Sequence, residues 1–283
     1  MATVDLSFIT RGRIPGSIKR EVASALRDCY RRFGSKSPGM VEIHIVDKEA
    51  TMRDFLREEK FRLGITTSGD GEFICSHDAW RNYPRIIICL EKLVKLNKLA
   101  RLGAVRHEAA HSALHGALEY YIFRIPENCR HTATIKGIDS AVLEQALYYL
   151  SVAIKDFEAT SFLVKHDYIN CQFAFALEWL QPSDNDKSTW KSAKADRQAK
   201  FVYLTTLLKP TLFAHPLLSL PRSKKVSLEK QIQLGRRVEE LIEHLEDAEQ
   251  SKLLQVTNMI VEDLDGDTHK NVDFALRQTM NLA

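Results

Sequence analysis

A change of hydrophobic periodicity along the chain is the feature that most limits its fold. Strand-like patterns all lie before residue 91, and the patterns beyond it are helical. Val41–Val46 ("VEIHIV") alternates apolar and polar residues, which predicts a half-buried strand, and Glu72–Cys75 predicts a short one. The continuous apolar run Arg85–Leu90 predicts a strand buried on both faces. The sequence therefore predicts an α+β fold, mostly helical, with a small sheet and a helical C-terminal half.

Apolar residues recur at helical spacing in the other long segments. They predict helices over Ile18–Arg32, Ala50–Leu63, Asn97 to about Ile122, about Ser140–Lys165, and Leu228–Asp263. The polar segment 181–189 ("QPSDNDKST") is the best candidate for a linker. We therefore expect one domain over residues 1–180. A helical region over 190–283 would pack on it or form a small subdomain.

Composition narrows the class of protein. Of 283 residues, 45% are apolar and 27% charged, which is typical of a globular chain. Forty basic residues nearly balance 37 acidic ones, so nothing in the charge points to a nucleic-acid partner. The longest apolar runs are far shorter than the roughly 20 residues of a membrane span, and the first residues lack the pattern of a signal peptide. Five scattered cysteines without a CxxC pair indicate reduced thiols, so we expect a cytoplasmic protein.

The motif that carries chemistry lies in Ala104–Gly116, "AVRHEAAHSALHG". His107 and His111 are four residues apart, which on a helix places them about 6 Å apart along the axis and about 40° apart around it. Two imidazoles so placed can bind one zinc ion, and Glu108 beside them can act as general base on a zinc-bound water. This H-E-x-x-H pattern predicts metal-assisted hydrolysis. His115 lies about 12 Å along the axis from His107, so we expect it outside the ligand set, either behind a ligand or on the surface.

A catalytic zinc usually has three protein ligands, so a third must come from another segment. Two acids in Lys155–Val164 compete for that place, Asp156 and Glu158, and one helix face can present only one of them. Asp156 has small and apolar neighbours at helical spacing, where a carboxylate needs a cation or a donor. Glu158 has lysines at helical spacing, which is typical of a solvated face. These neighbours favour Asp156, with Glu158 as its alternative and Glu144 or His131 as further ones.

The two helices together resemble the zincin metallopeptidases whose third ligand is a glutamate, and the ImmA/IrrE and HtpX types are nearest in pattern. The resemblance covers roughly residues 41–165. The second family motif falls on residues 156–163 ("DFEATSFL") and places the ligand at Asp156, where the family has Glu. Thr160 stands where the family usually has Asn or Asp. The resemblance implies a small sheet above the catalytic helix, and one edge strand of that sheet could pair with a peptide substrate.

We therefore expect a cytoplasmic zinc metallopeptidase that hydrolyses peptide bonds, with His107, His111 and Asp156 as metal ligands and Glu108 as general base. Its partner would be a peptide or protein substrate. A further group should stabilise the oxyanion, and the sequence offers several without choosing between them: Tyr148, Tyr149, Tyr168, His131 and His166. Two alternatives stay open, a zincin-fold scaffold without catalytic activity and a helical interaction protein without a metal.

Overall fold

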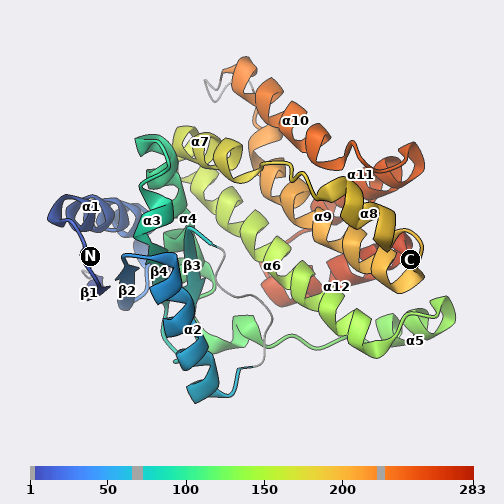
Figure 1. Ribbon diagram of the computed structural model, residues 1–283, viewed down its shortest axis with the longest axis horizontal. Helices are drawn as coiled ribbons and strands as arrows, with labels where there is room; N and C mark the ends of the chain where they lie inside the picture. The colour runs from blue at the N-terminus through green and yellow to red at the C-terminus, as the bar shows by residue number, and fades with distance from the viewer. Residues whose placement is uncertain (1–3, 66–72, 222–226) are drawn as a thin grey trace. The chain divides into compact units, whose positions relative to one another are not determined.

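The computed structural model describes residues 4–65, 73–221 and 227–283. It is an α+β structure, mostly helical, with a four-stranded mixed sheet in the described residues (Figure 1), which confirms the predicted fold class. The chain divides into two compact units, residues 1–121 with 162–175 and residues 122–161 with 176–283. Each unit thus combines two stretches of chain, whereas the predicted domains, 1–180 and 190–283, are continuous.

The first unit contains the whole sheet. Its elements are β1 (Asp5–Arg11), α1 (Gly16–Phe33), η1 (Gly34–Lys36), β2 (Met40–Val46), α2 (Glu49–Leu63), β3 (Cys75–Asp78), β4 (Arg85–Cys89), α3 (Leu90–Leu93), α4 (Lys98–Leu114) and η2 (Leu118–Tyr121). Helices α6 (Ser140–Lys165) and α7 (Ile169–Trp179) contribute residues to both units. The remaining elements belong to the second unit: α5 (Glu127–Lys136), α8 (Asp186–Ala193), α9 (Arg197–Leu218), α10 (Leu228–Ile242), α11 (Asp247–Glu262), α12 (Thr268–Thr279) and η4 (Met280–Leu282).

The strand order of the sheet is β1-β2-β4-β3. Strands β1, β2 and β4 are parallel, and β3 pairs antiparallel with β4 at one edge. Because neighbouring side chains in register share a face, His77 of β3 lies on the same face as its partner Ile86. The His77 ring stacks on His111 of α4, with 6.1 Å between centroids. The face that carries His77 is therefore the one toward α4.

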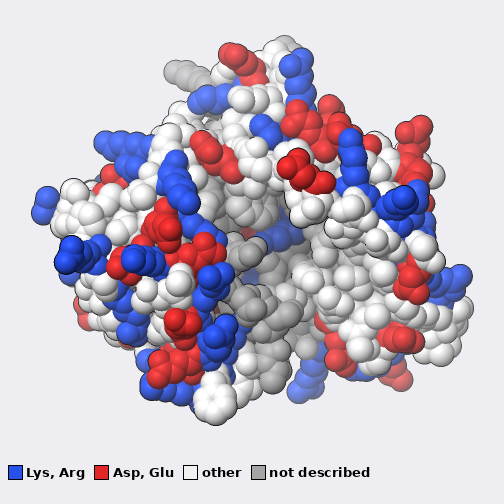
Figure 2. Space-filling model, in the orientation of Figure 1, with Lys and Arg blue, Asp and Glu red and all other residues white. Residues whose placement is uncertain are grey.

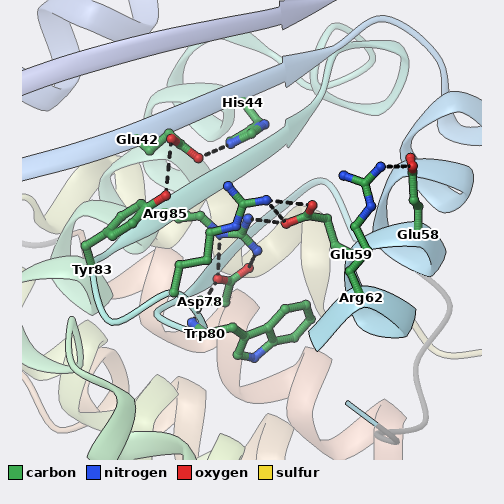
Figure 3. A network of polar contacts seen from close by, with 10 residues as sticks. Glu42, His44, Glu58, Glu59, Arg62, Asp78, Trp80, Tyr83 and Arg85 are labelled. Atoms are coloured by element: carbon green, nitrogen blue, oxygen red, sulfur yellow. Dashed lines mark hydrogen bonds and ion pairs between the residues drawn. The ribbon is translucent and has the colours of Figure 1, made fainter. Parts of the chain in front are cut away.

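The opposite face of the sheet packs against α2. Val46, Ile87 and Cys89 form an apolar cluster there with residues of α2. Beside the cluster lies a polar network (Figure 3). The fully buried Arg85 guanidinium donates to Asp78 at 2.8 and 3.0 Å and to Glu59 of α2 at 2.8 Å. These charges link α2 to both strands of the β3–β4 pair, so the short edge strand is fixed by ion pairs as well as by its ladder.

The second unit has an apolar core of its own. On α9, Phe201, Leu204, Leu208 and Leu212 are fully buried, which is the stripe expected of a core helix. The hydroxyls of Thr211 on α9 and Thr257 on α11 lie 3.0 Å apart and satisfy each other inside that core.

Most of the predicted elements are confirmed within a few residues: α1, β2, α2, β4, the Asn97 cap of α4, and α6. Four points of the prediction need correction. Strand β1 and helices α3, α5 and α7 were not predicted. The short strand expected over Glu72–Cys75 is β3 at Cys75–Asp78, with Glu72 outside the described residues. The helix expected over Leu228–Asp263 is two helices, α10 and α11, separated by residues 243–246.

The fourth correction concerns α4, which ends at Leu114 and not near Ile122. His115 leaves helical geometry at φ −127° and ψ 27°. A Cβ on the next residue, Gly116, would lie 2.4 Å from the Ser112 carbonyl oxygen and 3.3 Å from Pro84. The chain can turn this tightly after α4 because residue 116 has no side chain.

Candidate metal centre

Small residues allow α4 to pack closely inside the first unit. Its N-terminus is capped by Asn97, whose Oδ1 accepts from the Ala100 amide at 3.0 Å. A Cβ on Gly103 would lie 2.2 Å from the Cys171 carbonyl oxygen, so the segment 162–175 lies directly against the helix backbone. Gln172 Nε2 also donates to the Gly103 carbonyl at 3.0 Å. These contacts fix α4 and therefore the direction of the side chains in its last two turns.

His107 and His111 converge as the sequence predicts. Both are buried, with 4% and 8% of their surface exposed, and their Nε2 atoms lie 3.1 Å apart. Two nitrogen ligands at about 2.0–2.1 Å from a tetrahedral zinc lie about 3.3–3.4 Å apart. The two Nε2 atoms are thus separated by nearly the distance that a shared ion requires.

Glu108 is buried beside the pair, with 6% of its surface exposed. The pKa of the Cys75 thiol of β3 is raised well above its usual value, mainly by burial and next by the charge of Glu108. Burial likewise raises the pKa of Tyr121, with smaller contributions from Asp78 and Glu108. The charge of the Glu108 carboxylate therefore acts on groups of the edge strand β3 and of η2.

Asp156, on the α6 part of the second unit, is buried, with 9% of its surface exposed. Its Oδ2 lies 3.4 Å from the Lys209 ammonium of α9 in the same unit. One ligand atom each from His107, His111 and Asp156 lie within 4.8 Å of one another, a grouping that can hold a metal ion. Two imidazoles and one carboxylate are a ligand set that zinc uses.

Glu158 has partners elsewhere in the second unit. Its two carboxylate oxygens accept from Thr268 Oγ1 at 2.8 Å and from Asn271 Nδ2 at 2.7 Å, both on α12. The side chain thus ties α6 to α12. The two remaining alternatives, Glu144 on α6 and His131 on α5, are exposed.

The tyrosines and the histidine proposed from the sequence to stabilise the oxyanion have the following contacts. Tyr168 donates to Asp28 at 2.9 Å, and His166 Nδ1 lies 2.8 Å from the Phe162 carbonyl oxygen. Tyr148 and Tyr149 are neighbours on α6, with ring centroids 5.6 Å apart.

His77, which the sequence analysis did not consider, lies next to a histidine of α4. Its ring stacks on His111, and its Nδ1 lies 2.8 Å from the Tyr121 hydroxyl. The alternation of Cys75 and His77 in a strand could have indicated that both face the same helix. Only the stacking of His77 on His111 shows that this helix is α4.

Thr160, which stands at the position of the family's Asn or Asp, is fully buried. Its hydroxyl oxygen has no hydrogen-bond partner among the described residues.

No helix in the described residues is both long and apolar enough to cross a membrane. No family model, curated protein or solved structure matches the chain.

Proposed function

We propose that this protein is a zinc-dependent metallopeptidase of the zincin type that hydrolyses peptide bonds in the cytoplasm. The observation that carries the proposal is the 3.1 Å separation of the His107 and His111 Nε2 atoms, with the buried Glu108 carboxylate beside them. Two imidazoles buried this close together are costly as mere packing but useful as ligands, because they present two lone pairs to one point.

Asp156 is the third ligand in this proposal. Its carboxylate belongs to the three-residue grouping, whereas both oxygens of Glu158 accept hydrogen bonds from α12. Asp and Glu differ by one methylene, so an Asp ligand fits a site in which the donor atoms already lie within 4.8 Å of one another.

When bound, the zinc ion would polarise the peptide carbonyl and lower the pKa of a coordinated water. The chain's own residues supply the rest. Glu108 accepts a proton from the attacking water and then gives it to the departing amine, so the carboxylate ends the cycle in its starting state. His107, His111 and Asp156 hold their donor atoms in place and leave the fourth position to water or substrate.

The edge strand β3 supports a peptide as the substrate class. It lies at one edge of the sheet, and Cys75 and His77 on one of its faces point toward α4. A peptide in extended conformation could add to this edge by main-chain hydrogen bonds. Acidic and basic side chains are mixed over the face shown in Figure 2. All five cysteines are free, as in a reducing compartment.

A catalytically inactive scaffold on the same fold is the second candidate. It is favoured by the Lys209 ammonium 3.4 Å from Asp156 and by the Thr160 hydroxyl, which stands at the family's supporting position and has no hydrogen-bond partner within the described part of the chain. Both features would affect the affinity of the site for zinc, and neither changes the Glu108 carboxylate.

The test combines metal analysis with cleavage. Purified untagged protein should contain about one zinc per chain, and His107→Ala should lose it, whereas the exposed His131→Ala serves as a matched control and should keep it. Glu108→Gln should keep the zinc and lower the cleavage of an unfolded protein by about 10²–10⁴-fold. Cleavage that survives Glu108→Gln would contradict the mechanism. A zinc-loaded wild type that cleaves no unfolded substrate would favour the scaffold.

A further inference from the structure

The third histidine of the motif, His115, lies behind His111 at the end of α4 and not on the surface. It is fully buried, and its Nδ1 lies 3.1 Å from Nδ1 of His111. The other ring nitrogen of His111, Nε2, is the one that lies 3.1 Å from His107. His111 therefore stands between two histidines and uses a different nitrogen toward each.

The local backbone explains why residues four apart meet through Nδ1. His115 is the C-cap of α4, and its amide donates to the His111 carbonyl oxygen at 2.6 Å. Its ring lies edge-on to Tyr120, with 5.4 Å between centroids, in a T-shaped arrangement that limits its rotation. The ring is thus held against His111.

The chemistry of imidazole fixes the direction of this hydrogen bond. Two Nδ1 atoms at 3.1 Å bond only if one carries the proton and the other a lone pair. A metal-binding Nε2 must have its lone pair available, so a neutral His111 that binds zinc carries its proton on Nδ1. His115 must then accept at Nδ1 and carry its own proton on Nε2.

We propose that His115 is a positioning residue that holds His111 in the tautomer and orientation required for zinc binding. The proposal rests on the proposed function, since it assigns a role within the same zinc site. Outer hydrogen-bond partners of ligating histidines fix the ring and increase its basicity, and their loss typically weakens metal binding about 10–100-fold. A backbone carbonyl or carboxylate usually has this role, and here a second histidine has it.

Two substitutions at residue 115 separate the acceptor from the bulk of the side chain. In His115→Asn, Oδ1 can occupy the place of Nδ1 and accept the same hydrogen bond, whereas His115→Leu fills the space without an acceptor. The zinc dissociation constant, measured by competition with a chromophoric chelator, should rise about 10–100-fold in His115→Leu and only a few-fold in His115→Asn. The melting temperature of the zinc-free proteins shows whether either variant is merely less well folded.

Nitrogen NMR of the wild-type protein tests the same inference without a mutation. The zinc-loaded protein should show His111 protonated at Nδ1 and His115 at Nε2. A His115→Leu variant with wild-type zinc affinity, or a His115 protonated at Nδ1 in the loaded protein, would overturn the proposal. Absence of zinc from the wild type would instead overturn the proposed function, so the two failures are distinguishable.

Discussion

Asp156 and Glu158 are two residues apart on α6, and their carboxylates have different partners. Asp156 lies 3.4 Å from the Lys209 ammonium and belongs to the grouping with the two histidines. Glu158 accepts hydrogen bonds from Thr268 and Asn271 of α12. Residues two apart on a helix point to nearly opposite sides, so one carboxylate can serve a metal while the other holds a neighbouring helix.

Neutral amides at these two positions should therefore affect two different properties, zinc affinity and stability. Loss of a residue that hydrogen-bonds to a metal ligand weakens metal binding by about 10–100-fold. Asp156→Asn should weaken zinc binding by more than that, because it changes a ligand itself. Glu158→Gln should keep the zinc and lower the free energy of unfolding by about 1.5–3 kcal/mol, since hydrogen bonds to a charged acceptor are lost. Chelator competition and urea unfolding of the zinc-free proteins measure the two effects.

The reverse result, in which Glu158→Gln loses zinc and Asp156→Asn loses stability, would move the ligand to residue 158. Each variant is thus the control for the other, as both replace one oxygen by nitrogen on the same helix.

At the scale of elements, ion pairs hold α2 against the β3–β4 pair (Figure 3). The Glu59 carboxylate accepts from Arg85 at 2.8 Å and from Arg81 at 2.7 Å. Burial alone would raise the pKa of Glu59, but the Arg85 hydrogen bond and the charges of both arginines outweigh it and lower the pKa below its usual 4.5. Arg85 has no exposed surface, so the carboxylates around it must offset the free-energy cost of removing its charge from water.

Glu59→Gln should lower the free energy of unfolding by about 3 kcal/mol at pH 7, because a buried guanidinium loses a charged partner. The folded-state pKa of Glu59 lies below the unfolded value, so its contribution is complete above about pH 4.5 and is lost as the pH falls through the lower folded value. The difference between wild type and variant should therefore shrink on acidification, and urea unfolding from pH 7 to pH 3 measures it.

Glu58→Gln is the control on the same helix. Glu58 pairs with Arg62, and their side chains are 60% and 65% exposed. An exposed pair contributes at most about 1 kcal/mol, so this substitution should have little effect at any pH. Equal losses in the two variants would show that the buried network does not stabilise the packing of α2 on the sheet.

At the scale of the whole molecule, a bound metal should add to the stability of the folded chain. A ligand that binds only the folded state stabilises it by RT ln(1 + [L]/Kd), which is about 2.7 kcal/mol at 100 times the dissociation constant. Zinc should therefore raise the melting temperature of the wild type, and chelation should lower it again. The measurement is a thermal scan with and without zinc.

The melting temperature of His107→Ala should be the same with and without zinc. The melting temperature of His131→Ala, a substitution at an exposed residue, should rise with zinc as in the wild type. An equal rise in His107→Ala would show that zinc stabilises the fold through some other group.

The elements that were predicted correctly are those whose pattern is local. The helical spacing in α1, α2 and α6 and the apolar run of β4 each lie within one continuous segment, and the structure confirms them. Strand β1 was not predicted because its burial alternates only weakly and its stability comes from β2, where Asp5 pairs with Met40. The end of α4 was misplaced because Gly116 meets Pro84, a residue distant in sequence.

The sequence by itself determined that His107, Glu108 and His111 lie on one helix at ligand spacing, because helical geometry is set by neighbouring residues. Only the tertiary structure decided the partners of these side chains. Glu158 accepts hydrogen bonds from α12, and His77 lies on the edge strand with its ring stacked on His111 of α4. Both outcomes depend on segments far apart in the chain, whose approach is fixed by packing and which no local pattern encodes.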